Sequence, residues 1–193
     1  RQGSYKFAVD VRNHFSVRND TGLTPFSGSK TLVLPDNWTA SSTTKGMSLN
    51  GLSDVEQELE RNQLGLELTK QLGRWGLTAR YDYERKSGDK VMGSAMFLDA
   101  EAPNSVLLPV PVDYDNHEIG ITVDFATSSL QTQLSLLASE LDYDDRRVTW
   151  QNPYTNVFPA EAVNFPNGVG SLDQPADTRF YRARFNANYQ VSP

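Results

Sequence analysis

Strict alternation of side chains in the stretch RWGLTARYDYER constrains this chain more than any other feature. Between Arg74 and Arg85 the odd positions carry Trp, Leu, Ala and Tyr, whereas the even positions carry Gly, Thr, Arg, Asp and Glu. A period of two is that of a β-strand with one apolar and one polar face, and a helix would need apolar residues at i, i+3 and i+4. Because the polar face is highly charged, such a strand belongs either to the surface of a soluble sheet or to a membrane barrel with lipid outside and water inside.

Six segments alternate in this way, and they are joined in turn by long and by very short connections. The segments cover residues 5–17, 55–72, 74–85, 114–127, 130–143 and 178–191. Gly73 and Ser128-Ser129 leave room only for tight turns, whereas the stretches 18–54, 86–113 and 144–177 hold every proline except Pro193. Long loops at one end and short turns at the other are typical of outer-membrane barrels. A soluble β-sandwich usually has shorter loops at both ends.

These observations predict an all-β fold, namely part of an antiparallel, up-and-down transmembrane β-barrel over residues 1–193, with no separate domain. We expect about six to eight strands, and six clear ones fall short of the eight in the smallest bacterial barrels. The chain begins at Arg1 without a signal peptide and ends directly after a strand-like run, so we expect an internal portion of a longer protein.

Two local features of the pattern predict irregularities. Lys86-Ser87-Gly88-Asp89 has the chemistry of a turn, and an extended, proline-punctuated stretch follows to Val112. A further hairpin around Val91–Leu98 is an alternative within that stretch. Val55 and Leu59 are out of phase with Leu64 and the leucines after it. This shift predicts either a bulge near Arg61-Asn62 or a strand that continues beyond the membrane.

Composition excludes several classes of function. The chain of 193 residues contains no cysteine, which rules out disulfides, thiolate zinc sites and covalent haem attachment within these residues. A net charge of −6 argues against nucleic acid as a partner. No Ser/His/Asp set, phosphate-binding glycine loop or nucleophile elbow is present, so we expect no enzyme activity.

The polar positions of the strands are the candidate lumen- or partner-facing residues: Lys6, Asp10, Arg12, His14, Arg80, Asp82, Glu84, Glu118, Asp124, Arg182 and Arg184. Their mixed signs suit a lumen filled by a protein better than a selective ion channel, which concentrates charge of one sign. The alternative is a generic hydrated pore wall.

The opposite positions are the candidate lipid-facing or interfacial-belt residues: Tyr5, Trp75, Leu77, Tyr83, Ile121, Phe125, Phe185 and Tyr189, with Tyr181 as a further aromatic. Aromatic side chains gather at both membrane interfaces. The alternative for each aromatic is ordinary β-propensity.

Consecutive acids give the chain one weak candidate for a metal site. Asp142, Asp144 and Asp145 precede Arg146-Arg147, and clustered carboxylates are what Ca²⁺ binds. Solvated loop acids are the alternative. His14 and His117 are too few and too far apart for a metal site.

Particular motifs carry a resemblance to a known family. The run Trp75-Gly76-Leu77-Thr78-Ala79-Arg80-Tyr81, followed by Glu84 and Lys86-Ser87-Gly88, resembles the W-x-v-x-a-x-Y-x-x-E-x-k-x-G strand of the MtrB/PioB family of outer-membrane β-barrels. Three further segments are similar to family elements, in the expected order: Thr24-Pro25-Phe26 with Gly28 and Leu32-Val33-Leu34-Pro35, then Leu108-Pro109-Val110-Pro111-Val112-Asp113-Tyr114, then Ser139 with Trp150-Gln151-Asn152-Pro153-Tyr154. The chain departs from the family at Asp177, where asparagine is usual.

The resemblance implies a function for the whole barrel. Members sheath a periplasmic multihaem c-type cytochrome in the bacterial outer membrane, so that electrons pass between the periplasm and extracellular acceptors or donors. An extracellular multihaem cytochrome is a further implied partner, beside the outer-membrane lipid. The barrel itself binds no haem, since its partner carries the cofactor. The rival interpretations are a general diffusion porin and a soluble β-sandwich binding module.

Overall fold

The computed structural model describes residues 4–38, 51–97, 103–151, 153 and 169–191. In these ranges the chain forms two β-sheets, and all of its regular structure is strand. None of the described residues belongs to a helix long and apolar enough to cross a membrane.

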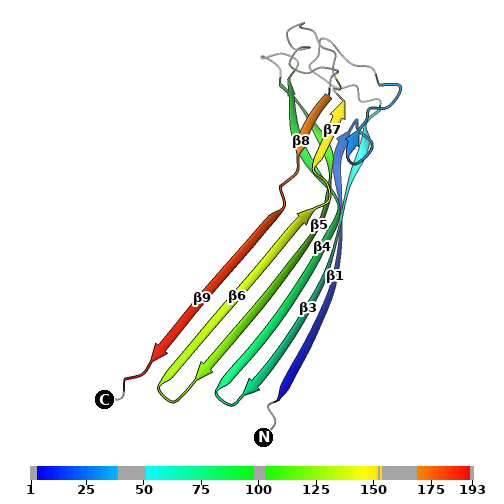
Figure 1. Ribbon diagram of the computed structural model, residues 1–193. Helices are drawn as coiled ribbons and strands as arrows, with labels where there is room; N and C mark the ends of the chain where they lie inside the picture. Colours follow the sequence, from blue (N-terminus) through cyan, green and yellow to red (C-terminus); the bar gives the residue numbers. More distant parts are fainter. Residues whose placement is uncertain (1–3, 39–50, 98–102, 152, 154–168, 192–193) are drawn as a thin grey trace.

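The larger sheet contains six long strands and confirms the predicted meander. The strands are β1 (Tyr5–Thr24), β3 (Ser53–Leu72), β4 (Trp75–Phe97), β5 (Pro103–Ala126), β6 (Leu130–Tyr143) and β9 (Thr178–Tyr189). They pair antiparallel in the order β1-β3-β4-β5-β6-β9. Both tight turns lie at the end of the sheet where the two chain termini lie, which we call the turn end (Figure 1). The other connections between these strands lie at the opposite, loop end. The predicted long connection at residues 86–113 is mostly strand, because β4 runs to Phe97 and β5 begins at Pro103.

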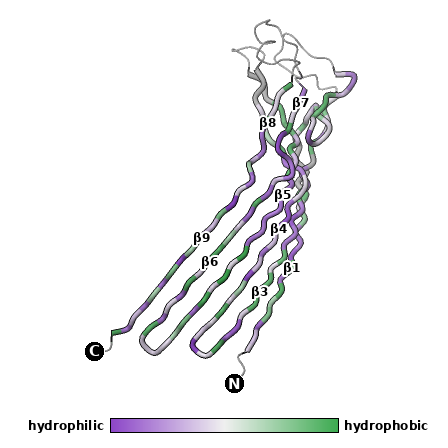
Figure 2. The backbone as a smooth tube through the Cα atoms, in the orientation of Figure 1, coloured by the Kyte–Doolittle hydropathy of each residue, from purple (hydrophilic) through white to green (hydrophobic). Residues whose placement is uncertain are grey.

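The pairing register is what separates polar from apolar side chains. The ladders β3–β4, β4–β5, β5–β6 and β6–β9 run without a shift, so each strand presents one parity of residue to each face. Figure 2 shows the resulting alternation of hydrophilic and hydrophobic residues along the strands. β1 and β9 are the edges of this sheet, which is open in the described part of the chain.

The predicted turn at Lys86–Asp89 is wrong, because β4 continues through it to Phe97. Gly88 serves a different purpose. Its φ of 128° lies in a region that favours glycine, and a Cβ built there would lie 1.9 Å from the Glu58 carbonyl oxygen. Glycine therefore lets the backbones of β3 and β4 approach closely where their pairing ends. Residues 91–97 extend the existing hairpin with β5 and add no further strand.

The shift of phase in residues 55–72 is explained by the second predicted alternative. The β1–β3 ladder runs unbroken past Arg61 and Asn62, so the predicted bulge there is wrong, and the register shifts between Asn19 and Leu23 instead. β3 simply continues beyond its alternating half. Val55 thereby reaches a buried position, with 4% of its surface exposed.

A second, small sheet lies at the loop end, in stretches predicted to be irregular loops. It consists of β2 (Thr31–Leu32), β7 (Arg147–Gln151) and β8 (Val169–Asp173). β2 pairs parallel with β7, and β7 pairs antiparallel with β8. The first and last long connections are thus joined to each other, and we call this sheet with residues 24–35 the cap (Figure 1).

The cap contains the hydrophobic core of the described structure. Phe26, Leu32 and Val148 pack on Val106, Leu108 and Val110 of β5, and Leu34, Met92 and Trp150 pack around them. Leu32, Leu108, Val110 and Val148 have no exposed surface. The extension of the β4–β5 hairpin beyond the other strands therefore supplies one wall of this core, and the cap supplies the other.

Candidate functional site

All eleven candidate partner-facing residues lie on one face of the six-stranded sheet, which we call the polar face. The pairings Asp10↔Gly65↔Asp82↔Glu118 and Arg12↔Gln63↔Glu84↔Asn116 run straight across four strands. The row Arg80↔Gly120↔Leu137↔Arg182 continues this face to β9. Sequence parity on six separate strands thus produces a single charged surface.

Five of the eleven candidate residues of the polar face form ion pairs on that face. Arg12 forms an ion pair with Asp10, and the Nε atom of Arg80 lies 2.5 Å from Oδ2 of Asp82. Arg61 Nε lies 3.6 Å from Oε1 of Glu84. The surface therefore presents both signs at short range, and it is not a ring of one sign of charge of the kind that selects ions.

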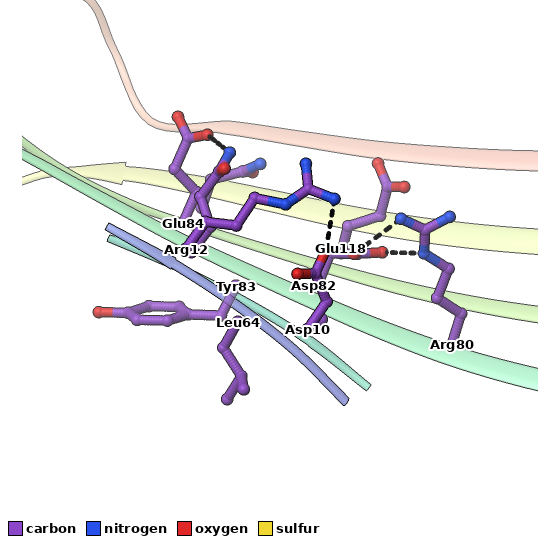
Figure 3. Close-up of a pocket in the computed structure, with 11 residues that line it drawn as sticks. Asp10, Arg12, Leu64, Arg80, Asp82, Tyr83, Glu84 and Glu118 are labelled. Atoms are coloured by element: carbon purple, nitrogen blue, oxygen red, sulfur yellow. Dashed lines mark hydrogen bonds and ion pairs between the residues drawn. The ribbon is translucent and has the colours of Figure 1, made fainter. Parts of the chain in front are cut away.

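A hollow of about 270 Å³ lies in the middle of this face. Its polar lining includes Asp10, Arg12, Arg80, Asp82, Glu84 and Glu118 (Figure 3). Gly65 forms part of its floor, where a Cβ would lie 3.3 Å from Oδ1 of Asp82. The absent side chain leaves room for the two carboxylates beside it, so the hollow is shaped by glycine as well as by charge.

Several residues of the polar face were missed from the sequence. Gln63 donates to Glu84 at 2.6 Å, Tyr114 donates to the same carboxylate at 2.9 Å, and Gln133 donates to Asp124 at 2.9 Å. Each has the parity of a polar-face position, so the alternation could have identified it. The prediction favoured charged residues, whereas the amides and the tyrosine hold those charges in place.

The eight candidate lipid-facing residues share the opposite face, which we call the apolar face. Leu77 pairs with Val123, and Ile121 pairs with both Ala79 and Leu136. Leu77 is 41% exposed and Ile121 is 42% exposed, although both are in the middle of the sheet. Apolar side chains that stay exposed in a continuous band mark a surface that contacts another apolar phase.

Aromatic residues border the apolar band at both ends. At the turn end the rings of Trp75 and Phe125 lie 4.6 Å apart, and Lys70 Nζ lies 4.2 Å from the ring centroid of Tyr5. From Trp75 to Tyr83 the strand extends roughly 26 Å at about 3.3 Å per residue, which is close to the length that a tilted barrel strand needs to cross a membrane.

Polar groups begin abruptly at the loop-end border of the band. The Tyr81 hydroxyl lies 2.8 Å from His117 Nδ1, and the Tyr83 hydroxyl donates to Asp115 at 2.5 Å. Just beyond them, Arg85 pairs with Asp113 at 3.1 Å. Tyrosines whose hydroxyls contact polar groups at the border of an apolar band have the arrangement of an interfacial belt.

Two of the three candidate calcium ligands are paired with different cations, and the third has another position. Asp145 is buried and forms an ion pair with Lys30, and Asp144 lies 3.9 Å from Arg85. Asp142 lies beside Asp115 on the apolar-face side of β6. No group of three or more His, Cys, Asp or Glu side chains within the described ranges could hold a metal ion. A calcium site stays a prediction without support from this placement.

Two charged groups near the cap have shifted pKa values. The Asp145 carboxylate, which accepts a hydrogen bond from Lys30, raises the pKa of that ammonium group. The pKa of Asp177 is lowered, chiefly because the backbone N–H of Tyr143 donates to it at 3.0 Å, and also because Arg146 is close by. Asp177 thus joins the end of β6 to the start of β9.

Comparison with known proteins decides which kind of sheet this is. Residues 1–192 match the family of outer membrane β-barrel porins named MtrB/PioB. The chain belongs to the MtrB/PioB family. It is also 27% identical, over 197 aligned positions, to the Outer membrane protein MtrB of Shewanella baltica strain OS185, of which it spans 27% of the length while all of this chain is covered.

Membership confirms the predicted fold class and places the chain in the outer membrane. The family is porin-like and is not a family of enzymes. The segments that resemble the family's loop elements come together in the cap: Phe26, Leu32, Leu108, Val110, Trp150 and Pro153 are all buried or partly buried there. The resemblance therefore rests on one alternating strand of the sheet and on the core of the cap.

Proposed function

We propose that the whole protein is an outer-membrane sheath for a periplasmic multihaem c-type cytochrome, and that electrons cross the membrane through that cytochrome. In this proposal the polar face lines the lumen and the apolar face contacts lipid. The loop end is extracellular, because outer-membrane barrels have short periplasmic turns and longer extracellular loops. The chain spans about a quarter of the curated relative that it matches, so this activity is proposed for the complete protein.

The observation that carries the proposal is the balance of opposite charges on the polar face, part of which is held in ion pairs. A pore for small charged solutes concentrates one sign of charge, whereas arginine–carboxylate pairs such as Arg12–Asp10 and Arg80–Asp82 leave a nearly neutral, hydrogen-bonding wall. Such a wall suits the irregular, mixed surface of a protein. This chain contains no cysteine for covalent haem attachment, so the haem belongs to the partner in this proposal.

The first experiment measures haem that co-purifies with the full-length protein in detergent. The sheath predicts a stable complex with haem absorbance in fixed ratio to the barrel. A general diffusion porin predicts a barrel without haem that conducts small solutes in a planar bilayer. A chain that is stable and monodisperse without detergent would contradict both membrane functions and favour a soluble binding module.

Two glycines offer a matched test of the polar face. A Cβ at Gly120, on the polar face, would meet only Leu137 Cδ1 at 4.0 Å, and one at Gly93, in the hairpin extension, would meet nothing within 4 Å. The sheet itself therefore has room for a larger residue at both. Gly120→Phe should reduce the haem that co-purifies with the barrel, whereas Gly93→Phe should not. Full haem content in an assembled Gly120→Phe variant would contradict a protein-filled lumen at this wall.

A further inference from the structure

The polar face continues beyond the apolar band toward the loop end, and the cap covers it there. β5 alternates without a register shift along its whole length, so Val106, Leu108 and Val110 lie on the same face as Asn116 and Glu118. Asn116 and Glu118 border the open hollow, whereas the three apolar residues are buried under the cap. The polar face is therefore open along the apolar band and covered at the loop end. The cap lies on the polar side of the six-stranded sheet, which we call the strand wall.

The cap has a second face, which points away from the strand wall. Leu32 and Val148 face the core, and their strand neighbours lie on the other side of the small sheet, which we call the free face. It presents Thr31, Thr149 and Ser171, which pair in a row, beside the pair Arg147↔Asp173. Arg147 Nε donates to Asp173 at 2.6 Å, so the two charges compensate each other. Gln151 and the exposed Val169 complete the free face, which is therefore mainly polar and carries no net charge.

The position of the cap is fixed by polar contacts as well as by its core. Thr24 Oγ1 donates to the Leu107 carbonyl oxygen at 2.5 Å, and Gln174 Nε2 donates to the Pro111 carbonyl oxygen at 3.2 Å. Lys30 and the buried Asp145 form an ion pair between the first and last long connections. The free face is thus held at a constant distance from the strand wall, as a binding surface requires.

We propose that the free face of the cap is a contact surface for the extracellular end of the protein that fills the lumen. This inference rests on the proposed function, because it takes the polar face as the lumen wall. The free face lies on the same side of the strand wall as the polar face. It is closer to the lumen axis by the thickness of the small sheet. Short hydroxyl side chains allow close approach, and they offer hydrogen bonds to a polar, uncharged patch of the partner.

The proposal has a mechanical consequence for the barrel. A rigid ledge on the luminal side narrows the outer mouth and limits how far the enclosed protein extends past the membrane. The electron-donating or electron-accepting end of that protein would be held at a defined height. Without the cap, only contacts with the alternating charges of the open polar face would fix the position of the enclosed protein along the barrel axis.

Photo-crosslinking in the full-length complex tests the contact. Benzoylphenylalanine is introduced at Ser171 on the free face, at Thr122 on the polar face within the band, and at Ser87, which shares the face of Tyr83 and Arg85. After irradiation, a haem-stained gel detects a band at the summed mass of barrel and haem protein. The cap contact predicts this band for Ser171 and Thr122 and none for Ser87.

The three positions separate the two proposals. A band from Thr122 without one from Ser171 would overturn the cap contact and leave the sheath intact. Equal bands from Ser171 and Ser87 would also overturn it, because the cap would not face inward. No haem protein in the preparation, with no band from Thr122, would overturn the proposed function and the cap contact with it.

Discussion

The strand wall and the cap place their apolar residues in opposite ways. In the wall, Leu77, Ile121 and Leu136 remain 41–47% exposed on one face of a single-layered sheet. Under the cap, Leu32 and Val148 of the cap and Leu108 of the β5 extension are completely buried between two layers. A soluble domain buries its apolar residues in its own core, whereas a barrel strand leaves them to the lipid. In the proposed arrangement one chain folds in two solvents, and the border between them lies between Tyr83 and Arg85.

The largest expected effect comes from truncating a leucine of β5 that is buried under the cap. Leu108→Ala should destabilise the cap by about 2–5 kcal/mol, because the cavity it leaves has no other atoms to fill it. Leu77→Ala, the same change in the wall, should cost clearly less, since lipid chains move into the space. Chemical unfolding of the full-length protein in vesicles, followed by the fluorescence of Trp150 and Trp75, compares the two. Equal costs would break the distinction between wall and cap.

Introducing a charge into the wall should have a slightly smaller effect that depends on the face. Leu77→Arg puts a guanidinium group in the apolar band, two residues inside its border at Trp75, and should cost up to about 2–4 kcal/mol, the range for a cation at the bilayer midplane. Thr78→Arg, one residue along the strand, should be mild because the side chain joins the charged polar face. Equilibrium refolding into vesicles measures both values. A Thr78→Arg cost as large as that of Leu77→Arg would show that the two faces are not in different solvents.

The smallest expected effect concerns acid at the junction of wall and cap. The lowered pKa of Asp177 means that its contribution is fully present above its ordinary pKa of about 3.9 and is lost as the pH falls through the lower folded value. The protection factor of the Tyr143 amide, corrected for intrinsic exchange, should therefore fall in strong acid. Asp177→Asn keeps an acceptor for this amide but should remove the pH dependence. An unchanged acid dependence in that variant would assign it to another group.

The strands of the wall could be predicted from the sequence, because the alternation within each strand is a local property. Alternation over ten or more residues identifies a strand and both of its faces without any knowledge of its neighbours. All eleven polar and all eight apolar candidates consequently fall on the expected faces.

The cap could not be predicted in the same way. Its strands have two or five residues, too few for a period to be recognised, and Thr31 pairs with Thr149 across more than half of the chain. Gly88 was misread for a related reason, since its role depends on the backbone of β3 passing close by. Leu108-Pro109-Val110 was expected to be extended but not to be a buried strand, because a proline stands between the two residues that face the core.

The most direct test of the central claim is the environment of two adjacent residues, Leu77 and Thr78. Spin labels at these positions in the full-length protein, reconstituted in bilayers, report collision rates with oxygen and with a polar relaxant. The account predicts high oxygen accessibility for the label at Leu77, and low oxygen accessibility for the label at Thr78, which faces the lumen. Equal accessibilities at the two positions, or the reverse order, would contradict the assignment of the apolar face to lipid and of the polar face to the lumen.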